Sequence, residues 1–188
     1  MIKSVSFCGV SSVKGLSPRR SIALISILDD DERFERPPLY GFAKILSQDH
    51  VDFYEEKSKL PLESVDDATG LLANGASPVE GHRVFCARDA IEIVEFVEDC
   101  IAEDRTLELI VHCYAGVSRS AAVAKFVCEH YGLALSTNRD LSDANPRVER
   151  LLKKVFNMCT QEQAMDQRGE FSRRMMPASG SKSKPNFP

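Results

Sequence analysis

Residues 107–132, LELIVHCYAGVSRSAAVAKFVCEHYG, decide the fold of this chain. The segment begins with Leu107–Val111, whose nearly continuous hydrophobicity predicts a strand covered on both faces of a sheet. A loop of small residues follows, and residues 120–131 then combine good helix formers with an apolar face, which predicts a helix that ends at Gly132 in a left-handed conformation. A buried strand, a tight loop and a helix in this order predict an α/β domain built around a central, mainly parallel sheet.

Three other segments have the pattern of strands. Residues 3–10 and 21–28 are short, apolar and rich in β-branched side chains, so we expect both in the buried sheet. In HVDFYEE, residues 50–56, apolar and polar side chains alternate with the period of two that is typical of a strand. The charged run DDDERFER, residues 29–36, is predicted to be an exposed loop without a function.

Helical periodicity marks two more segments. Residues 89–103 place apolar side chains at helical spacing, with acidic residues mainly on the other face. A last helix is predicted to begin with Asn145 as its N-cap and Pro146 as its first residue. In the long loop between residues 57 and 83, one short helix is expected near residues 63–73. The solvated face of the last helix is expected to carry Arg147, Arg150, Lys153 and Lys154.

The composition is that of an ordinary globular protein, because 43% of the 188 residues are hydrophobic and 28% are charged. We therefore expect one domain over residues 1–162, and we expect it to be a monomer. Residues 163–188 are predicted to form a flexible basic tail, since Gly, Ser and Pro are frequent there and no periodicity remains.

Charge, cysteine spacing and hydropathy exclude several kinds of partner. The net charge of -4 argues against a nucleic-acid or anionic-membrane surface, which would be strongly basic. The cysteines include no CxxC pair and no cluster with histidines, so we expect neither a metal nor another cofactor. The N-terminus lacks the pattern of a secretory signal, and no apolar run reaches the ~20 residues of a membrane span. We expect a protein of the reducing cytoplasm.

The loop between the predicted strand at 107–111 and the helix at 120–131 combines groups that bind an anion. Backbone N–H groups at the start of a helix are unpaired, and the helix dipole adds to their positive potential. The same field and the nearby guanidinium of Arg119 favour the thiolate form of Cys113, which is the nucleophilic form. Arg119 is suited to hold two oxygens of a phosphate in the planar, bidentate manner that lysine does not reproduce.

Three further residues of this loop have expected roles. Gly116 permits backbone angles that other residues avoid and allows an oxyanion to approach closely. The hydroxyl of Ser120 is placed to hydrogen-bond the departing thiolate of Cys113 when a covalent intermediate breaks down. His112 is expected to order the loop by hydrogen bonding to its backbone rather than to act as a base.

Residues 112–120, HCYAGVSRS, resemble the active-site signature of the protein tyrosine and dual-specificity phosphatase superfamily, HCxxGxxR followed by Ser or Thr. Every fixed position of that signature is present, and the resemblance extends in pattern over residues 20–160. It implies four or five mainly parallel strands flanked by helices, and hydrolysis of a phosphomonoester through a phosphocysteine intermediate on Cys113. The residues that would hold the phosphate are Tyr114, Ala115, Gly116, Val117, Ser118 and Arg119.

The resemblance also implies a general acid, which in this superfamily is an aspartate on a loop after an earlier strand. This chain departs from the pattern, because aligning VDFYE with the usual strand end places Glu55 where the family has its aspartate. Asp52 is the second candidate. The remaining candidates are acidic residues of the long loop, namely Asp66, Asp67 and Glu80.

The substrate is less closely defined than the chemistry. The variable positions of the loop add no second cation, whereas relatives that act on phosphoinositides commonly carry a basic residue there, so a singly phosphorylated group is favoured. We expect a phosphotyrosine phosphatase that acts on a phosphorylated protein or a small phosphomonoester, with phosphoserine and phosphothreonine accepted if the pocket is shallow. Two alternatives stay open: an RNA 5′-phosphatase or phosphoinositide phosphatase with the same loop, and a pseudophosphatase that only binds phosphorylated partners.

Overall fold

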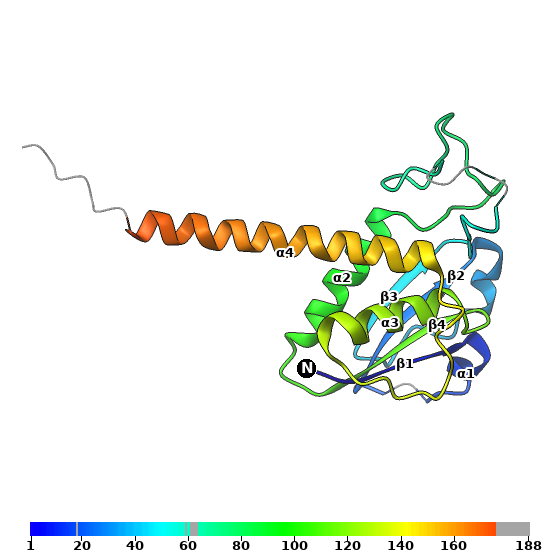
Figure 1. The fold of residues 1–188 in the computed structure, drawn as a ribbon. Helices are drawn as coiled ribbons and strands as arrows, with labels where there is room; N and C mark the ends of the chain where they lie inside the picture. The colour runs from blue at the N-terminus through cyan, green and yellow to red at the C-terminus, as the bar shows by residue number, and fades with distance from the viewer. Residues whose placement is uncertain (18, 59, 61–63, 176–188) are drawn as a thin grey trace, which may run out of the picture. The chain divides into compact units, whose positions relative to one another are not determined.

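A sheet forms the centre of the fold, as Figure 1 shows. It has four strands, and all of them run parallel. The computed structural model describes residues 1–17, 19–58, 60 and 64–175, with the backbone alone for residues 162–175. The expected α/β class with a central parallel sheet is confirmed, and the sheet order is β1-β4-β2-β3. The strands are β1 (Ile2–Gly9), β2 (Ile22–Leu28), β3 (Lys44–Asp49) and β4 (Leu107–Cys113).

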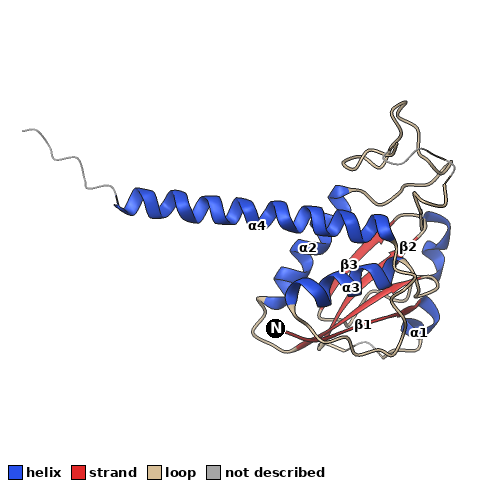
Figure 2. Ribbon diagram, in the orientation of Figure 1, coloured by secondary structure: helices blue, strands red, loops and turns tan. Residues whose placement is uncertain are grey.

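Helices flank this sheet, as the colouring by secondary structure in Figure 2 makes clear. Helix α3 packs against β1 and β4, and α2 contacts β3. The predicted ends are confirmed at two places: Gly132 takes φ 65° after α3, and Asn145 caps α4 by accepting the N–H of Val148 at 3.1 Å. The described helices are α1 (Val10–Lys14), the 3-10 helix η1 (Asp30–Glu35), α2 (Ala87–Ile101), α3 (Arg119–Tyr131) and α4 (Pro146–Met175).

The core is centred on the two inner strands. Every residue of β2 is buried, and β4 is buried from Leu109 to Cys113. Both strands are covered on their two faces, which is why their sequences are nearly continuous apolar runs. Cys113 is the last residue of β4 and pairs with Gly9 of β1, so both lie at the carboxyl edge of the sheet. In open α/β sheets this edge is where ligands bind.

The third predicted strand is wrong in position. Strand β3 lies before residues 50–56 and pairs with β2 from Ala23↔Lys44 to Leu28↔Asp49. After His50 the chain leaves the sheet, and Phe53 is buried in a small apolar cluster with residues of the following loop. The alternation in HVDFYEE therefore reflects burial in a loop cluster, which a period of two does not distinguish from burial in a strand.

The prediction of a short helix near residues 63–73 is wrong for the part of that segment that the structure describes. Residues 61–63 lie outside the description. Residues 64–73 contain a turn, closed by a bond of 2.8 Å from the Gly70 N–H to the Asp66 carbonyl, and a bridge between Val65 and Leu72. Gly70 has φ +72°, a conformation that interrupts a right-handed helix.

Helix α4 continues to Met175, so helical backbone extends into the segment for which the sequence predicts a flexible tail. Residues 176–188 of that segment lie outside the described residues. Contacts divide the chain into two units, Met1–Phe156 and Asn157–Pro188, and the sheet belongs to the first. Within the described ranges, no helix combines the length and the apolar character of a membrane span.

The predicted solvated face of α4 is wrong for Arg147, which is only 2% exposed. Helical side chains tilt toward the N-terminus of their helix, so a residue in the first turn reaches back over the preceding chain. The Nε atom of Arg147 donates to the carbonyl oxygen of Phe85 at 2.9 Å. This arginine is therefore part of the packing between α4 and the loops below it.

Candidate active site

The loop from Cys113 to Arg119 joins the end of β4 to the start of α3. The sulfur of Cys113 accepts the N–H of Gly116 at 3.2 Å and lies 3.2 Å from the hydroxyl oxygen of Ser120. Gly116 has φ +71°, in the left-handed region that favours glycine. The structure thus brings together the three residues that the sequence singles out around the sulfur, while their catalytic roles remain predictions.

The carboxyl end of β1 packs against the backbone of this loop. The N–H of Val10 donates to the Tyr114 carbonyl at 3.1 Å. A Cβ on Gly9 would lie 2.9 Å from the carbonyl oxygen of Ala115, and a Cβ on Gly116 would lie 2.1 Å from the Gly9 nitrogen, so neither backbone leaves room for a side chain. Sequence reasoning missed Gly9, for which the local signal is a glycine at the end of an apolar strand.

Arg119 is oriented by groups from two other segments and is only 4% exposed. Its Nη1 donates to the His50 carbonyl at 2.6 Å and forms an ion pair with Asp29, while Nη2 lies 3.6 Å from a carboxylate oxygen of Glu32. Its Nε is buried and has no hydrogen-bond partner among the described residues. Because Nη1 is occupied, Nε and the adjacent Nη2 are the donors left for an anion.

The two carboxylates near Arg119 come from the run that is predicted to be an exposed loop, and that prediction is wrong for them, because Asp29 and Glu32 are partly buried and belong to the start of η1. Asp29 is the N-cap of η1, and its N–H donates to Glu32 at 3.0 Å in a capping box. Burial raises the pKa of Asp29, and the guanidinium of Arg119 acts in the opposite direction. The available signal was the Asp-x-x-Glu spacing of a capping box.

A cavity of about 500 Å³ opens above the loop. Cys113 and Arg119 both line it, and so do the predicted phosphate-binding residues other than Gly116. Tyr54 and Tyr114 add aromatic surface to its wall, and the ammonium of Lys57 lies 3.8 Å from the centre of the Tyr54 ring. The cavity therefore places a thiol, a guanidinium and aromatic rings around one space.

Among the predicted acids, Asp52 is the one that lines this cavity. Its Oδ1 accepts two hydrogen bonds of 2.7 Å, one from the hydroxyl of Ser118 and one from the side-chain amide of Asn145. Ser118 belongs to the loop that carries Cys113. The second-ranked candidate is thus connected directly to the loop between Cys113 and Arg119.

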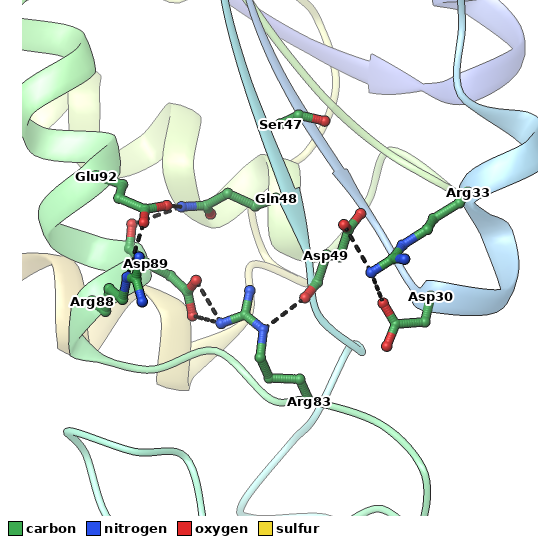
Figure 3. A pocket seen from close by; sticks show the side chains of 9 residues that line it. All are labelled: Asp30, Arg33, Ser47, Gln48, Asp49, Arg83, Arg88, Asp89 and Glu92. Atoms are coloured by element: carbon green, nitrogen blue, oxygen red, sulfur yellow. Dashed lines mark hydrogen bonds and ion pairs between the residues drawn. The ribbon is translucent and has the colours of Figure 1, made fainter.

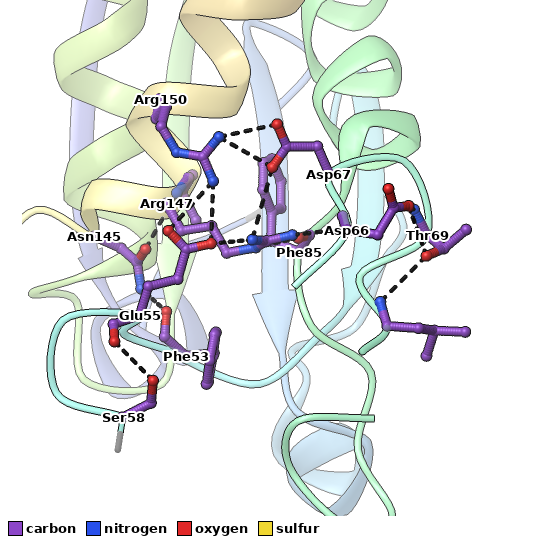
Figure 4. A network of polar contacts seen from close by, with 12 residues as sticks. Phe53, Glu55, Ser58, Asp66, Asp67, Thr69, Phe85, Asn145, Arg147 and Arg150 are labelled. Carbon is purple, nitrogen blue, oxygen red and sulfur yellow. Dashed lines mark hydrogen bonds and ion pairs between the residues drawn. The ribbon is translucent and has the colours of Figure 1, made fainter. Parts of the chain in front are cut away.

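The structure places Glu55, the first-ranked acid, in a different environment, which Figure 4 shows. Its carboxylate forms an ion pair with the buried Arg147 and accepts a bond of 3.1 Å from Arg150. Glu55 is absent from the described lining of the cavity that contains Cys113. The surroundings of Glu55 are those of a structural ion pair at the base of α4.

The loop acids also lie away from the cavity that contains Cys113. Asp66 accepts the N–H and the hydroxyl of Thr69 at 2.8 Å, and these hydrogen bonds lower the pKa of Asp66. Asp67 pairs with Lys154 at 2.9 Å. Glu80 is exposed. The described structure brings none of these three carboxylates to the cavity above Cys113.

Two histidines near the loop are neutral because they are buried. Burial lowers the pKa of His112 to about 4 and that of His50 to about 3. The ring of His112 interacts with the backbone of Cys113, and this interaction raises the pKa of His112 against the larger effect of burial. The ordering of the loop by His112 stays a prediction, and a ring of such low basicity agrees with a role other than that of a base.

A second cavity, of about 370 Å³, lies between side chains of β3 and α2 and is shown in Figure 3. The described residues that line it include neither a cysteine nor a histidine, and each of the three arginines among them faces a carboxylate. These pairs are Arg33–Asp49 at 3.1 Å, Arg83–Asp89 at 2.7 Å and Arg88–Glu92 at 3.3 Å. Its described lining offers no thiol nucleophile, so the cavity above Cys113 is the better candidate for an active site.

Comparison with known proteins leaves the family of this chain open. No family model and no curated protein matches the sequence. One similar solved structure is the human tyrosine phosphatase-like serine/threonine/tyrosine-interacting protein, which is 18% identical with a TM-score of 0.42, over 74% of this chain and 80% of that one. A likeness of this size does not establish a shared function, so the functional assignment depends on the geometry of the loop.

Proposed function

We propose that this protein is a cysteine-dependent phosphatase that hydrolyses phosphotyrosine or a related phosphomonoester. The observation that carries this proposal is the buried, unpaired Nε of Arg119, which has no partner among the described residues and belongs to a side chain lining the same cavity as Cys113. A buried donor without a partner is costly, and a bound phosphate oxygen would satisfy it. Asp29 and the His50 carbonyl keep the guanidinium in one orientation, which favours bidentate binding.

In the first chemical step, the thiolate of Cys113 attacks the phosphorus and the bond to the leaving oxygen breaks, which produces a phosphocysteine. The loop N–H groups and Arg119 stabilise the negative charge on the equatorial oxygens. We assign the general acid to Asp52 in place of Glu55, because Asp52 lines the cavity. Its proton passes to the leaving oxygen, so the product is a neutral alcohol or phenol.

In the second step, the carboxylate of Asp52 accepts a proton from water while the water oxygen attacks the phosphorus. The bond between phosphorus and sulfur breaks, and inorganic phosphate is released. The hydroxyl of Ser120, 3.2 Å from the sulfur, stabilises the thiolate that is regenerated.

The lining of the cavity supports a singly phosphorylated aromatic substrate over a polyphosphate. Tyr54 and Tyr114 offer surface to a phenyl ring. Four carboxylates and two cations line the cavity, a balance that disfavours inositol polyphosphates and triphosphate-ended RNA. The residues in this balance are Asp29, Glu32, Asp52 and Asp143 against Lys57 and Arg119.

The test is hydrolysis of p-nitrophenyl phosphate and of a phosphotyrosine peptide by the wild type and by Cys113→Ser. We expect turnover by the wild type, inhibition by vanadate, and loss of turnover in the variant. Cys128→Ser, which removes a half-buried thiol from α3, is the matched control and should remain active. Full activity of Cys113→Ser would exclude the proposed nucleophile, and peptide binding without turnover would favour the pseudophosphatase alternative.

A further inference from the structure

A hydroxyl of the phosphate loop is directed at the proposed acid. The buried Ser118 donates from Oγ to Oδ1 of Asp52 at 2.7 Å. The phenolic oxygen of Tyr54 lies 2.5 Å from the same Ser118 oxygen and 3.1 Å from the Asp143 carbonyl oxygen, and we assign its single hydrogen to the shorter contact. Because a serine also has a single hydroxyl hydrogen, the bond received from Tyr54 leaves the Ser118 hydrogen for the carboxylate of Asp52.

A second donor fixes the same carboxylate oxygen. The side-chain amide of Asn145 donates to Oδ1 of Asp52 at 2.7 Å and to the Phe53 carbonyl at 3.0 Å. Its own oxygen accepts the N–H of Val148, so the orientation of the amide is determined by bonds on both sides. An oxygen that already accepts two donors is a poor site for a proton, which leaves Oδ2 of Asp52 to carry it.

We propose that Ser118, held by Tyr54, is the positioning residue that aims Oδ2 of Asp52 at the leaving oxygen. This inference rests on the function proposed above. Ser118 directly precedes Arg119, so the segment that grips the phosphate also sets the direction from which the proton is delivered. Orientation of this kind is worth a large factor in rate, since a misplacement of about 1 Å costs on the order of 10²-fold.

Replacement of Ser118 by alanine tests the role of its hydroxyl alone, because the backbone of Ser118 makes its own hydrogen bonds. The Ser118 carbonyl accepts the N–H of Ala122 at 3.0 Å and that of Asn145 at 3.3 Å. Neither bond uses the hydroxyl, so we expect both to persist in an alanine variant. The variant Ser118→Ala therefore releases Asp52 from one donor while the start of α3 keeps its backbone support.

The experiment compares phenyl phosphate, a poor leaving group, with p-nitrophenyl phosphate, a good one. In Ser118→Ala we expect kcat for phenyl phosphate to fall about 10- to 100-fold and kcat for p-nitrophenyl phosphate to fall less than about threefold, because only the poor leaving group depends strongly on the proton. Ser118→Thr, which keeps a hydroxyl, should restore phenyl phosphate turnover. Tyr54→Phe should change the ratio in the same direction as Ser118→Ala. The double variant Ser118→Ala/Asp52→Asn should be no slower than Asp52→Asn.

Ser58→Ala is the matched control, because the hydroxyl of Ser58 lies on the chain segment after Asp52 but donates to the Glu55 carbonyl at 2.7 Å. It should leave the ratio of the two rates unchanged. Two results would overturn this inference alone, provided that turnover requires Cys113. One is an unchanged ratio of the phenyl phosphate and p-nitrophenyl phosphate rates in Ser118→Ala. The other is a loss of kcat in the double variant that equals the product of the losses in the two single variants. Absence of turnover by the wild type would instead overturn the proposed function.

Discussion

Replacement of Glu55 by glutamine tests whether the carboxylate of Glu55 has a structural or a catalytic role. Glu55 neutralises Arg147, whose side chain is 1% exposed and whose other partners include carbonyl oxygens at 2.9 and 3.2 Å. Removing one partner of a buried ion pair costs roughly 3–5 kcal/mol. Glutamine keeps a carbonyl acceptor, and Asp67 remains 3.9 Å from Nη1 of Arg147, so we expect a smaller loss of about 2 kcal/mol in the free energy of unfolding. For a chain of this size that loss lowers the Tm by about 4–8 °C.

Urea denaturation measures the loss of stability, and the rates with phenyl and p-nitrophenyl phosphate measure the catalytic contribution. Glu55→Gln should lower stability and leave the ratio of the two rates unchanged at a temperature where the variant is folded. Glu56→Gln is the control, because Glu56 is the exposed neighbour. A stable Glu55→Gln variant that is slow with phenyl phosphate alone would return the general acid to Glu55 and refute the assignment of Asp52.

Two further predictions concern the loop support and the buried histidines. Gly9→Ala would place a Cβ 2.9 Å from the Ala115 carbonyl oxygen. We therefore expect the free energy of unfolding measured in urea to fall by about 1–3 kcal/mol, and vanadate to inhibit the variant more weakly. Unchanged inhibition by vanadate would contradict the conclusion that the end of β1 holds the loop in place. Burial lowers the pKa of His50 and His112 from 6.5 to about 3 and about 4, so the unfolded chain binds more protons than the folded one between these values and 6.5. The contribution of the neutral histidines to the free energy of unfolding is complete above about pH 6.5 and declines as the pH is lowered, by up to about 1.4 kcal/mol per pH unit for each histidine. We therefore expect the urea midpoint to be lower at about pH 5 than at about pH 7.5. Equal midpoints at the two pH values would contradict the buried, neutral state of His50 and His112.

The strand, loop and helix around Cys113 could be predicted from residue types that are close to one another in the sequence. The apolar run before it, the small residues of the loop and Gly132 act over a few residues, and the structure places each as the sequence predicts. The capping of α4 by Asn145 is equally local. Periodicity and capping describe how a segment is buried and where it starts and stops, so they are readable without knowledge of distant neighbours.

The partners of the charged groups were decided only when the chain folded. Asp29 meets Arg119 across 90 residues and Glu55 meets Arg147 across 92, so neither pairing has a local signature. The same holds for Gly9, whose lack of a side chain matters because a loop more than a hundred residues later presses against it. A pattern of residue types reports burial and backbone preference, whereas the choice between Asp52 and Glu55 depends on which side chain the packed strands and helices bring to the sulfur of Cys113, and that is a property of the assembled core.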